Sequence, residues 1–181
     1  MPLEQRLFIG LELPASCKAD IAELDPGIRG LRWLPSTQIH LTMGFLGNVT
    51  RGEEAALAEK LSGVHVPRFF LPLQGVGSFN ARGRPSVVWI GTGKGHPHLF
   101  ALHQHIQSAV LRSGLEPDLK PFHPHVTIAR AKDVSAQALQ PFLRAHRDDD
   151  FGLFEVTEFI LYSSVLHTEG ATHRAESRFP L

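Results

Sequence analysis

The sequence is poor in cysteine, in net charge and in long hydrophobic runs, and each shortage excludes a class of protein. Cys17 is the single cysteine, which excludes an intrachain disulfide and a multi-cysteine zinc site. The 18 basic and 18 acidic residues give a formal net charge of zero, which excludes a strongly basic nucleic-acid coat protein. No apolar run reaches the length of about 18 residues that a membrane-spanning helix needs. The first eight residues also lack the hydrophobic region of a signal peptide, so we expect a cytoplasmic protein without a membrane partner.

What the chain does contain is enough apolar sequence for a core. It has 181 residues, of which 43% are hydrophobic and 20% are charged. This length and composition predict one folded domain over residues 1–181. Histidine is abundant, with eleven copies.

The hydrophobic periodicity predicts strands that alternate with helices. Helices are expected at 14–24, at about 50–63 (where Thr50 and Glu53 form a capping box), at 97–113 and at 135–145. Strands are expected at 6–12, 38–46, 68–79, 86–92, 123–130, 152–165 and 172–178. The segment 152–165 is expected to be one long buried strand, because both of its faces carry apolar residues. This mixture indicates an α+β or α/β sandwich.

Two of the expected strands carry the same four-residue pattern. Residues 40–43 (HLTM) and residues 125–128 (HVTI) both read His-apolar-Thr-apolar, and 125 − 40 gives a separation of 85 residues. Each copy precedes an expected helix. The repeat indicates a duplicated unit with a pseudo-twofold axis and one shared cleft.

Strand geometry gives these two motifs a chemical meaning. Residues two apart on a strand share a face and lie about 6.6–6.8 Å apart, so His40 and Thr42 share one face, as do His125 and Thr127. One neutral imidazole can accept a proton while a charged one donates a proton, and hydroxyl groups can donate to phosphate oxygens. A single copy of the pattern is more typical of an ordinary half-exposed strand than of a catalytic site. The repetition favours a catalytic pair.

The sequence resembles the two-histidine phosphoesterases, and within them the bacterial and archaeal RNA 2′,3′-cyclic phosphodiesterases, also called 2′-5′ RNA ligases. The motifs that carry this resemblance are residues 40–47 (HLTMGFLG) and 121–130 (PFHPHVTIAR). Residues 5–14, 87–91 and 156–163 are similar to the same family. The resemblance implies an α+β, bilobal, pseudo-twofold fold in which two antiparallel sheets flank a central cleft and helices cover the outside.

The resemblance also implies roles for individual residues. His40 is expected to be the proton donor and His125 the proton acceptor, with Thr42, Thr127 and Arg130 binding the substrate phosphate. Simple alternation would place Arg130 on the face opposite His125, so a bulge or the strand end must reorient it.

The implied reaction is hydrolysis of a terminal 2′,3′-cyclic phosphate of RNA to a 2′-phosphate, with reversible 2′-5′ ligation when an RNA 5′-hydroxyl replaces water. No metal and no cofactor are expected. The expected partners are RNA or oligonucleotide ends and nucleotides, and the protein is expected to be a monomer.

Other readings of the sequence remain open at this point. The His-x-His pairs at 96/98, 103/105 and 123/125 could indicate a metal site. Glu116 and Asp118 are the only acidic residues near these pairs in the sequence, so helix surface is the favoured interpretation. The segment 91–95 (GTGKG) lacks the spacing of a phosphate loop and indicates a turn. A non-catalytic nucleotide-binding or RNA-binding module with the same cleft is the alternative function. Candidate base-stacking and phosphate-contacting residues are Trp33, Phe45, Phe79, Phe122, Tyr162, Arg82, Arg84, Lys94, Lys120 and Arg130.

Overall fold

The computed structural model describes residues 4–181. Residues 1–3, with which the expected domain and the N-terminal segment begin, lie outside the described residues. The helices are α1 (Ala15–Glu23), α2 (Arg51–Leu61), α3 (Pro97–Arg112) and α4 (Ala136–Ala145), with a short 3₁₀ turn, η1, at Ser36–Gln38. The strands are β1 (Glu4–Glu12), β2 (Leu31–Trp33), β3 (His40–Thr50), β4 (Phe69–Ala81), β5 (Arg84–Gly91), β6 (His125–Ala131), β7 (Asp150–Val156), β8 (Glu158–His167) and β9 (Gly170–Pro180). None of these helices is long and apolar enough to cross a membrane.

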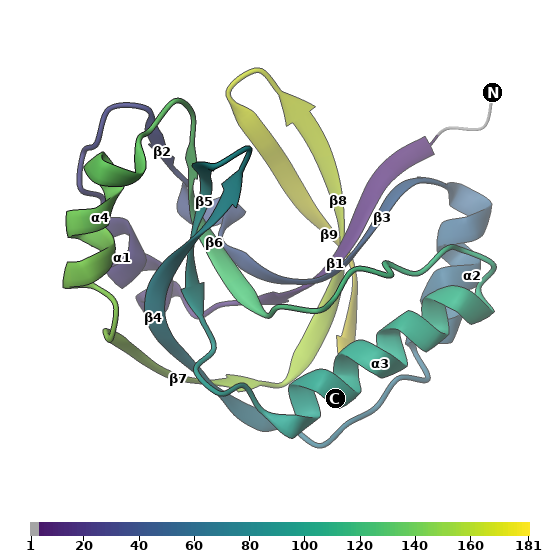
Figure 1. Cartoon of the computed structure of the whole chain (residues 1–181). Coiled ribbons are helices and arrows are strands. Elements are labelled where there is room, and N and C mark those ends of the chain that lie inside the picture. Colours follow the sequence, from purple (N-terminus) through teal and green to yellow (C-terminus); the bar gives the residue numbers. More distant parts are fainter. Residues whose placement is uncertain (1–3) are drawn as a thin grey trace.

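The strands form a curled antiparallel sheet in the order β7-β4-β5-β6-β3-β1-β8-β9, with β2 added alongside the end of β6 (Figure 1). Between β3 and β6 the register contains a single pair, Leu41 opposite Val126. This seam divides the sheet into a first half-sheet (β3, β1, β8, β9) and a second half-sheet (β6, β5, β4, β7). The expected bilobal α+β fold with two antiparallel sheets is confirmed, and the two sheets are joined at one residue pair.

Two helices cover each half-sheet, and each half-sheet with its two helices forms one lobe (Figure 1). Helices α2 and α3 pack on each other and on β3, whereas α4 packs on β4 and β5, and α1 packs on β7. Helix α1 follows β1 of the first half-sheet but covers the second, and α3 follows β5 of the second half-sheet but covers the first. Each lobe therefore receives one helix from its own part of the chain and one from the other part.

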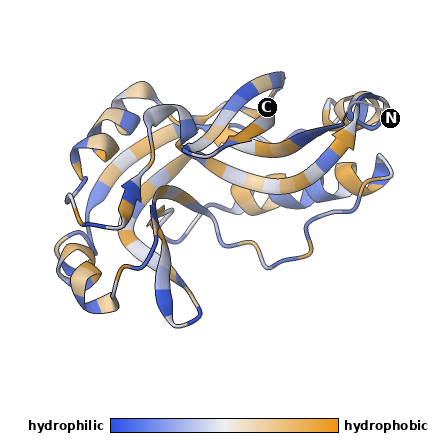
Figure 2. Cartoon of the chain, turned by 90° about the horizontal axis from the view of Figure 1, so that it is seen from above, coloured by the Kyte–Doolittle hydropathy of each residue, from blue (hydrophilic) through white to orange (hydrophobic). Residues whose placement is uncertain are grey.

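The predicted periodicities account for the buried side chains. In α3, Leu99, Leu102, Ile106 and Val110 are buried along one face, and Figure 2 shows the corresponding apolar and polar bands along the ribbons. Helix α2 begins with the predicted capping box: the Thr50 side chain accepts a hydrogen bond from the Glu53 backbone, and the Glu53 side chain accepts one from the Thr50 backbone. The apolar face of α3 packs toward the core, and the capping box sets the residue at which α2 begins.

One strand prediction is wrong, and one strand was missed. The segment 152–165 is not a single strand, because β7 ends at Val156, Thr157 lies outside both strands and β8 begins at Glu158. Strand β7 pairs with β4 and β8 pairs with β1, so the chain crosses from one half-sheet to the other at this point. Strand β2 has three residues, too few to show a period.

Candidate active site

The two repeated motifs meet at the seam between the half-sheets. Leu41 and Val126, the paired residues, are both fully buried, as the alternation predicts. The neighbouring residues His40, Thr42, His125 and Thr127 are half-buried on the other face. An antiparallel pair places residue 40 beside residue 127 and residue 42 beside residue 125. The seam therefore brings two imidazoles and two hydroxyl groups around one point.

Both motifs contain a β-bulge at the same position, the fourth residue. In the register of β1 with β3, Ile9 is opposite Gly44 and Gly10 is opposite Thr42, which leaves Met43 without a partner. In the register of β5 with β6, Val88 is opposite Ala129 and Trp89 is opposite Thr127, which leaves Ile128 without a partner. The bulges extend the pseudo-twofold relation beyond the four-residue pattern.

These bulges change the face on which the following residue lies. After each bulge two successive residues are buried, Met43 with Gly44 and Ile128 with Ala129. The next residue, Phe45 in β3 and Arg130 in β6, is then exposed on the face that carries the histidines. The reorientation that the sequence required for Arg130 is thus present, and Phe45 occupies the equivalent position in the other lobe.

The ring of His125 is held in one tautomer. Its Nδ1 lies 2.6 Å from the backbone carbonyl oxygen of His123, and because a carbonyl only accepts, Nδ1 carries the proton. The Nε2 atom is then left with a free lone pair. Phe79 packs edge-on against the ring with centroids 4.8 Å apart. Burial lowers the pKa of His125, although the bond to His123 opposes this effect, so the ring is neutral at pH 7.

His40 lies in a more enclosed environment than His125. Its ring packs against Phe8 and His173, with centroid distances of 4.7 Å and 5.2 Å, and its Nε2 lies 3.1 Å from Thr42 Oγ1. Burial is the main reason that the pKa of His40 is lowered to about 4, and the neighbouring His173 adds to the effect. A hydrogen bond to the backbone of Gln38 acts in the opposite direction. Both catalytic candidates thus bond to the backbone two residues earlier.

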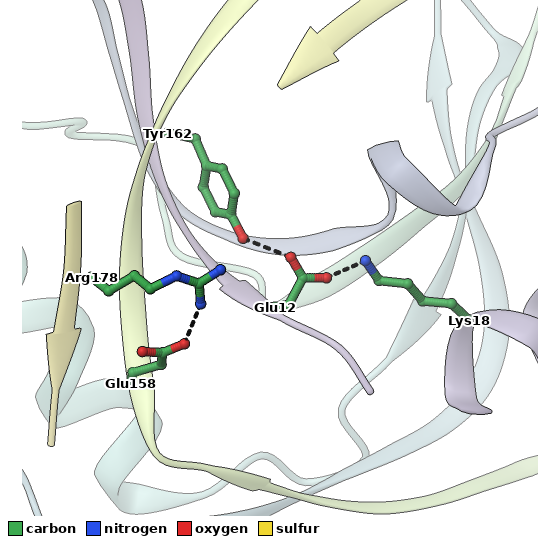
Figure 3. A network of polar contacts seen from close by, with 5 residues as sticks. All are labelled: Glu12, Lys18, Glu158, Tyr162 and Arg178. Atoms are coloured by element: carbon green, nitrogen blue, oxygen red, sulfur yellow. Dashed lines mark hydrogen bonds and ion pairs between the residues drawn. The ribbon is translucent and has the colours of Figure 1, made fainter. Parts of the chain in front are cut away.

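A polar network supports the aromatic side chains behind His40 (Figure 3). Tyr162 stacks on Phe8 at 5.0 Å and donates its hydroxyl proton to Glu12 Oε2 at 3.0 Å, while Lys18 pairs with the other oxygen of Glu12. Burial and the nearby Glu12 raise the pKa of Tyr162, which keeps the hydroxyl protonated. Because Tyr162 is buried behind Phe8, it is not available for base stacking.

On the other side of the seam lies a cavity of about 210 Å³ that adjoins His125 and Thr42. Its walls include three of the expected stacking residues, Phe45, Phe79 and Phe122, together with one expected basic residue, Lys120. Trp33 does not line it, since the Trp33 indole nitrogen donates to the Ile21 carbonyl at 3.1 Å. The cavity offers exposed aromatic surface next to the motifs.

Gln107 of α3 is a positioning residue that the sequence did not indicate. Its amide nitrogen lies 3.5 Å from the carbonyl of the bulge residue Met43, and its amide oxygen accepts from the backbone of Asp118 at 3.0 Å. Its neighbour His103 stacks on Phe122 with centroids 4.0 Å apart. Gln107 therefore fixes the loop that borders the cavity. No sequence signal could have identified it, because a glutamine within a helix is typical of a surface position.

The other histidines form no metal-binding group. Among residues 4–181, no set of three or more His, Cys, Asp or Glu side chains converges as ligands would. His96 instead caps α3, since its Nδ1 accepts from the backbone of His98 at 3.1 Å.

Comparison with known proteins decides the family. A family model described as the 2′-5′ RNA ligase superfamily matches residues 14–168. The chain belongs to this superfamily. Relatives named "RNA 2′,3′-cyclic phosphodiesterase" include one from Aeropyrum pernix, 32% identical over 80% of this chain and 82% of the relative. Another, from Escherichia coli strain K12, is 32% identical over 88% of this chain and 87% of the relative.

Members of the superfamily with solved structures have the same fold. Escherichia coli LigT in complex with 3′-AMP superposes with a TM-score of 0.81 at 30% identity, with 99% of both chains covered. LigT in complex with ATP gives a TM-score of 0.80 at 28% identity, again with 99% of both chains covered. The family resemblance and the fold expected from the sequence are confirmed.

Proposed function

We propose that the protein hydrolyses the terminal 2′,3′-cyclic phosphate of RNA to a 2′-phosphomonoester by acid-base catalysis with two histidines. The observation that carries the proposal is the meeting of two equivalent His-Thr strands, each with its bulge, at the Leu41–Val126 seam. The relatives named RNA 2′,3′-cyclic phosphodiesterase support the chemistry, and the protein is an enzyme of that class.

His125 is the proton acceptor in this proposal. Its Nδ1 is occupied by the His123 carbonyl, so its free Nε2 takes a proton from a water molecule. The water oxygen forms a bond to phosphorus, the bond from phosphorus to the 3′ oxygen breaks, and the 3′ oxygen takes a proton from His40. The products are a 2′-phosphate and a 3′-hydroxyl, and the two histidines exchange protonation states.

Substrate binding favours the protonated form of His40, which takes its proton from the solvent. With a pKa of about 4, His40 is neutral in the free protein at pH 7. A bound phosphate places negative charge beside the ring, which favours the imidazolium form. The hydroxyl groups of Thr42 and Thr127, on the same face, donate to the non-bridging oxygens of the reacting phosphate. Arg130, further along the same face of β6, adds positive charge for the phosphates of the substrate.

The same geometry serves reversible ligation. When the 5′-hydroxyl of a second RNA replaces water, its oxygen attacks phosphorus and a 2′-5′ linkage forms. Imidazole and hydroxyl groups provide the acid, the base and the phosphate contacts, so we propose a reaction without metal or other cofactor. We further propose a cytoplasmic monomer of one domain whose partners are RNA ends and nucleotides.

The test is incubation with an oligonucleotide that ends in a 2′,3′-cyclic phosphate, followed by identification of the product as a 2′- or 3′-phosphate. His40→Ala and His125→Ala should each lower kcat by about 10²–10⁴-fold. His105→Ala, an exposed histidine on α3, is the matched control and should retain activity. Near-normal turnover in both active-site variants would refute the mechanism. Strong loss of activity with EDTA would indicate a metal-dependent hydrolase instead. Nucleotide binding without turnover would indicate a non-catalytic binding module.

A further inference from the structure

Arg32 and Arg130 form an unexplained pair of like charges at one end of the cleft. In the antiparallel pairing of β2 with β6, Arg32 is directly opposite Arg130. Side chains at directly opposite positions share a face and have Cβ atoms about 4.5–5.5 Å apart. Two positive charges in this position destabilise the pair of strands unless an anion lies between them.

Both residues lie on the face of the sheet that carries the histidines. The neighbours of Arg32 in β2, Leu31 and Trp33, pack against the core, and Trp33 contacts Phe142 of α4 at a centroid distance of 5.9 Å. Arg32 itself is exposed on the opposite face. The bulge in β6 places Arg130 on the face of His125, and the cross-strand pairing places Arg32 on that same face.

Neither arginine is neutralised by an acidic side chain. Over residues 4–181, no carboxylate lies within ion-pair distance of Arg32 or Arg130. Arg32 donates from Nη1 to the backbone carbonyl of Glu169 at 2.7 Å, in the turn between β8 and β9. A carbonyl orients the guanidinium group but leaves its charge unpaired, which is suited to an anionic ligand.

The pair lies on the His40 side of the cleft, along β6 from the seam at Val126. A Cβ atom built on Gly170 would lie 3.0 Å from Arg32 Nη1 and 2.8 Å from the amide nitrogen of Gln38, whose backbone bonds to His40. Arg130 follows Val126 by four residues, of which the bulge absorbs one, so it lies about 10 Å along the strand from the seam. From there the side chain extends toward a phosphate group next to the reacting one.

We propose that Arg32 and Arg130 bind the phosphodiester that joins the terminal nucleotide of the RNA substrate to the nucleotide before it. This inference rests on the proposed function, in which His40 protonates the 3′ oxygen and the terminal ribose therefore lies on its side of the phosphate. The chain leading away from that ribose in the 5′ direction then passes the two arginines. The subsite makes the enzyme selective for oligonucleotide ends over mononucleotides.

The experiment compares two substrates, 2′,3′-cyclic AMP and the dinucleotide ApA that ends in a 2′,3′-cyclic phosphate. The readout is the ratio of kcat/KM for the dinucleotide to kcat/KM for the mononucleotide. Arg32→Gln should lower this ratio about tenfold, the usual effect of losing a charge-assisted hydrogen bond, and Arg32→Lys should restore part of it. Arg144→Gln, on the outer helix α4, is the matched control and should leave the ratio unchanged.

A second readout is the salt dependence. For the dinucleotide, the slope of log affinity against log salt should become shallower by about 0.7 in Arg32→Gln, as expected for one lost contact to a single strand. An unchanged ratio or an equal loss for both substrates would overturn the proposal.

If the wild-type protein hydrolyses neither substrate, the proposed function fails, and binding then tests the subsite alone. In that case Arg32→Gln should weaken binding of ApA 2′-phosphate about tenfold more than binding of 2′-AMP. Equal weakening of both would overturn the subsite as well.

Discussion

The enclosed position of His40 predicts a specific pH dependence of stability that His40→Asn should remove. Burial and His173 lower the pKa of His40 to about 4 in the folded chain, against an ordinary value of 6.5. The unfolded chain therefore binds a proton at His40 between these two values while the folded chain does not. The contribution of neutral His40 to the free energy of unfolding is complete above pH 6.5 and is lost as the pH falls toward 4.

The size of the effect follows from the difference between the two pKa values. At about 1.4 kcal/mol for each pH unit, the loss amounts to about 3 kcal/mol between pH 6.5 and pH 4. The charged and titratable groups that face His40 are Glu12, Lys18 and His173, and Glu12 opposes the shift. Burial also lowers the pKa values of His103, His125 and His173, so these residues contribute a loss of the same sign.

The assay is urea unfolding of the wild-type protein and His40→Asn at several pH values between 4 and 7.5. The quantity to compare is the change in the free energy of unfolding with pH, because the lost ring packing adds a constant offset that cancels. The wild-type protein should lose about 3 kcal/mol more than the variant over this range. His105→Asn, at an exposed position, should follow the wild-type curve. Parallel curves for wild type and His40→Asn would refute the assignment of a low pKa to His40.

Three further predictions concern activity and packing. In the proposed mechanism one of the two histidines must be protonated, and the pKa values of both His40 and His125 are lowered. We therefore expect kcat/KM in a pH titration to be highest below pH 6.5. A maximum above pH 7 would contradict this. In Gly77→Ala the new methyl would lie 2.4 Å from the Trp89 ring, so urea unfolding should show a loss of about 1–3 kcal/mol; an unchanged midpoint would mean that the ring yields freely. Gln107→Ala removes the hydrogen bonds to Met43 and Asp118 and should cost about 1–3 kcal/mol, with faster hydrogen exchange at Asp118. Unchanged exchange there would show that the loop is held by other contacts.

The strand faces of the site could be predicted from the sequence because local alternation governs them. Leu41 and Val126 are buried and their histidine and threonine neighbours face the cleft, as a period of two requires. The repeat identified the pair of strands, and the seam joins them at those two residues.

The register irregularities could not be predicted in the same way. A bulge depends on the pairing of one strand with its neighbour, and a single strand read alone does not contain that information. The sequence showed that Arg130 needed a bulge in order to reach the cleft, but it gave no sign of the equivalent bulge at Met43.

The remaining differences come from contacts between distant parts of the chain. Segment 152–165 crosses between half-sheets at Thr157 without a glycine or proline to mark the crossing. Arg32 lies in a strand of three residues, and its position opposite Arg130 follows from tertiary pairing alone. Periodicity detects which face of an element is buried, and it does not detect which element lies beside it.

The exchange of α1 and α3 between the lobes links their folding. Helix α1 departs from β1 and covers the half-sheet of His125, while α3 departs from β5 and covers the half-sheet of His40. A fragment that ended between α2 and β4 would lack α3, one of the two helices that cover its own half-sheet, and its complement would lack α1. We therefore expect a single unfolding transition, because neither lobe can stay folded after the other has unfolded. The two copies of the motif have become one cooperative unit, although the pattern in the sequence still separates them.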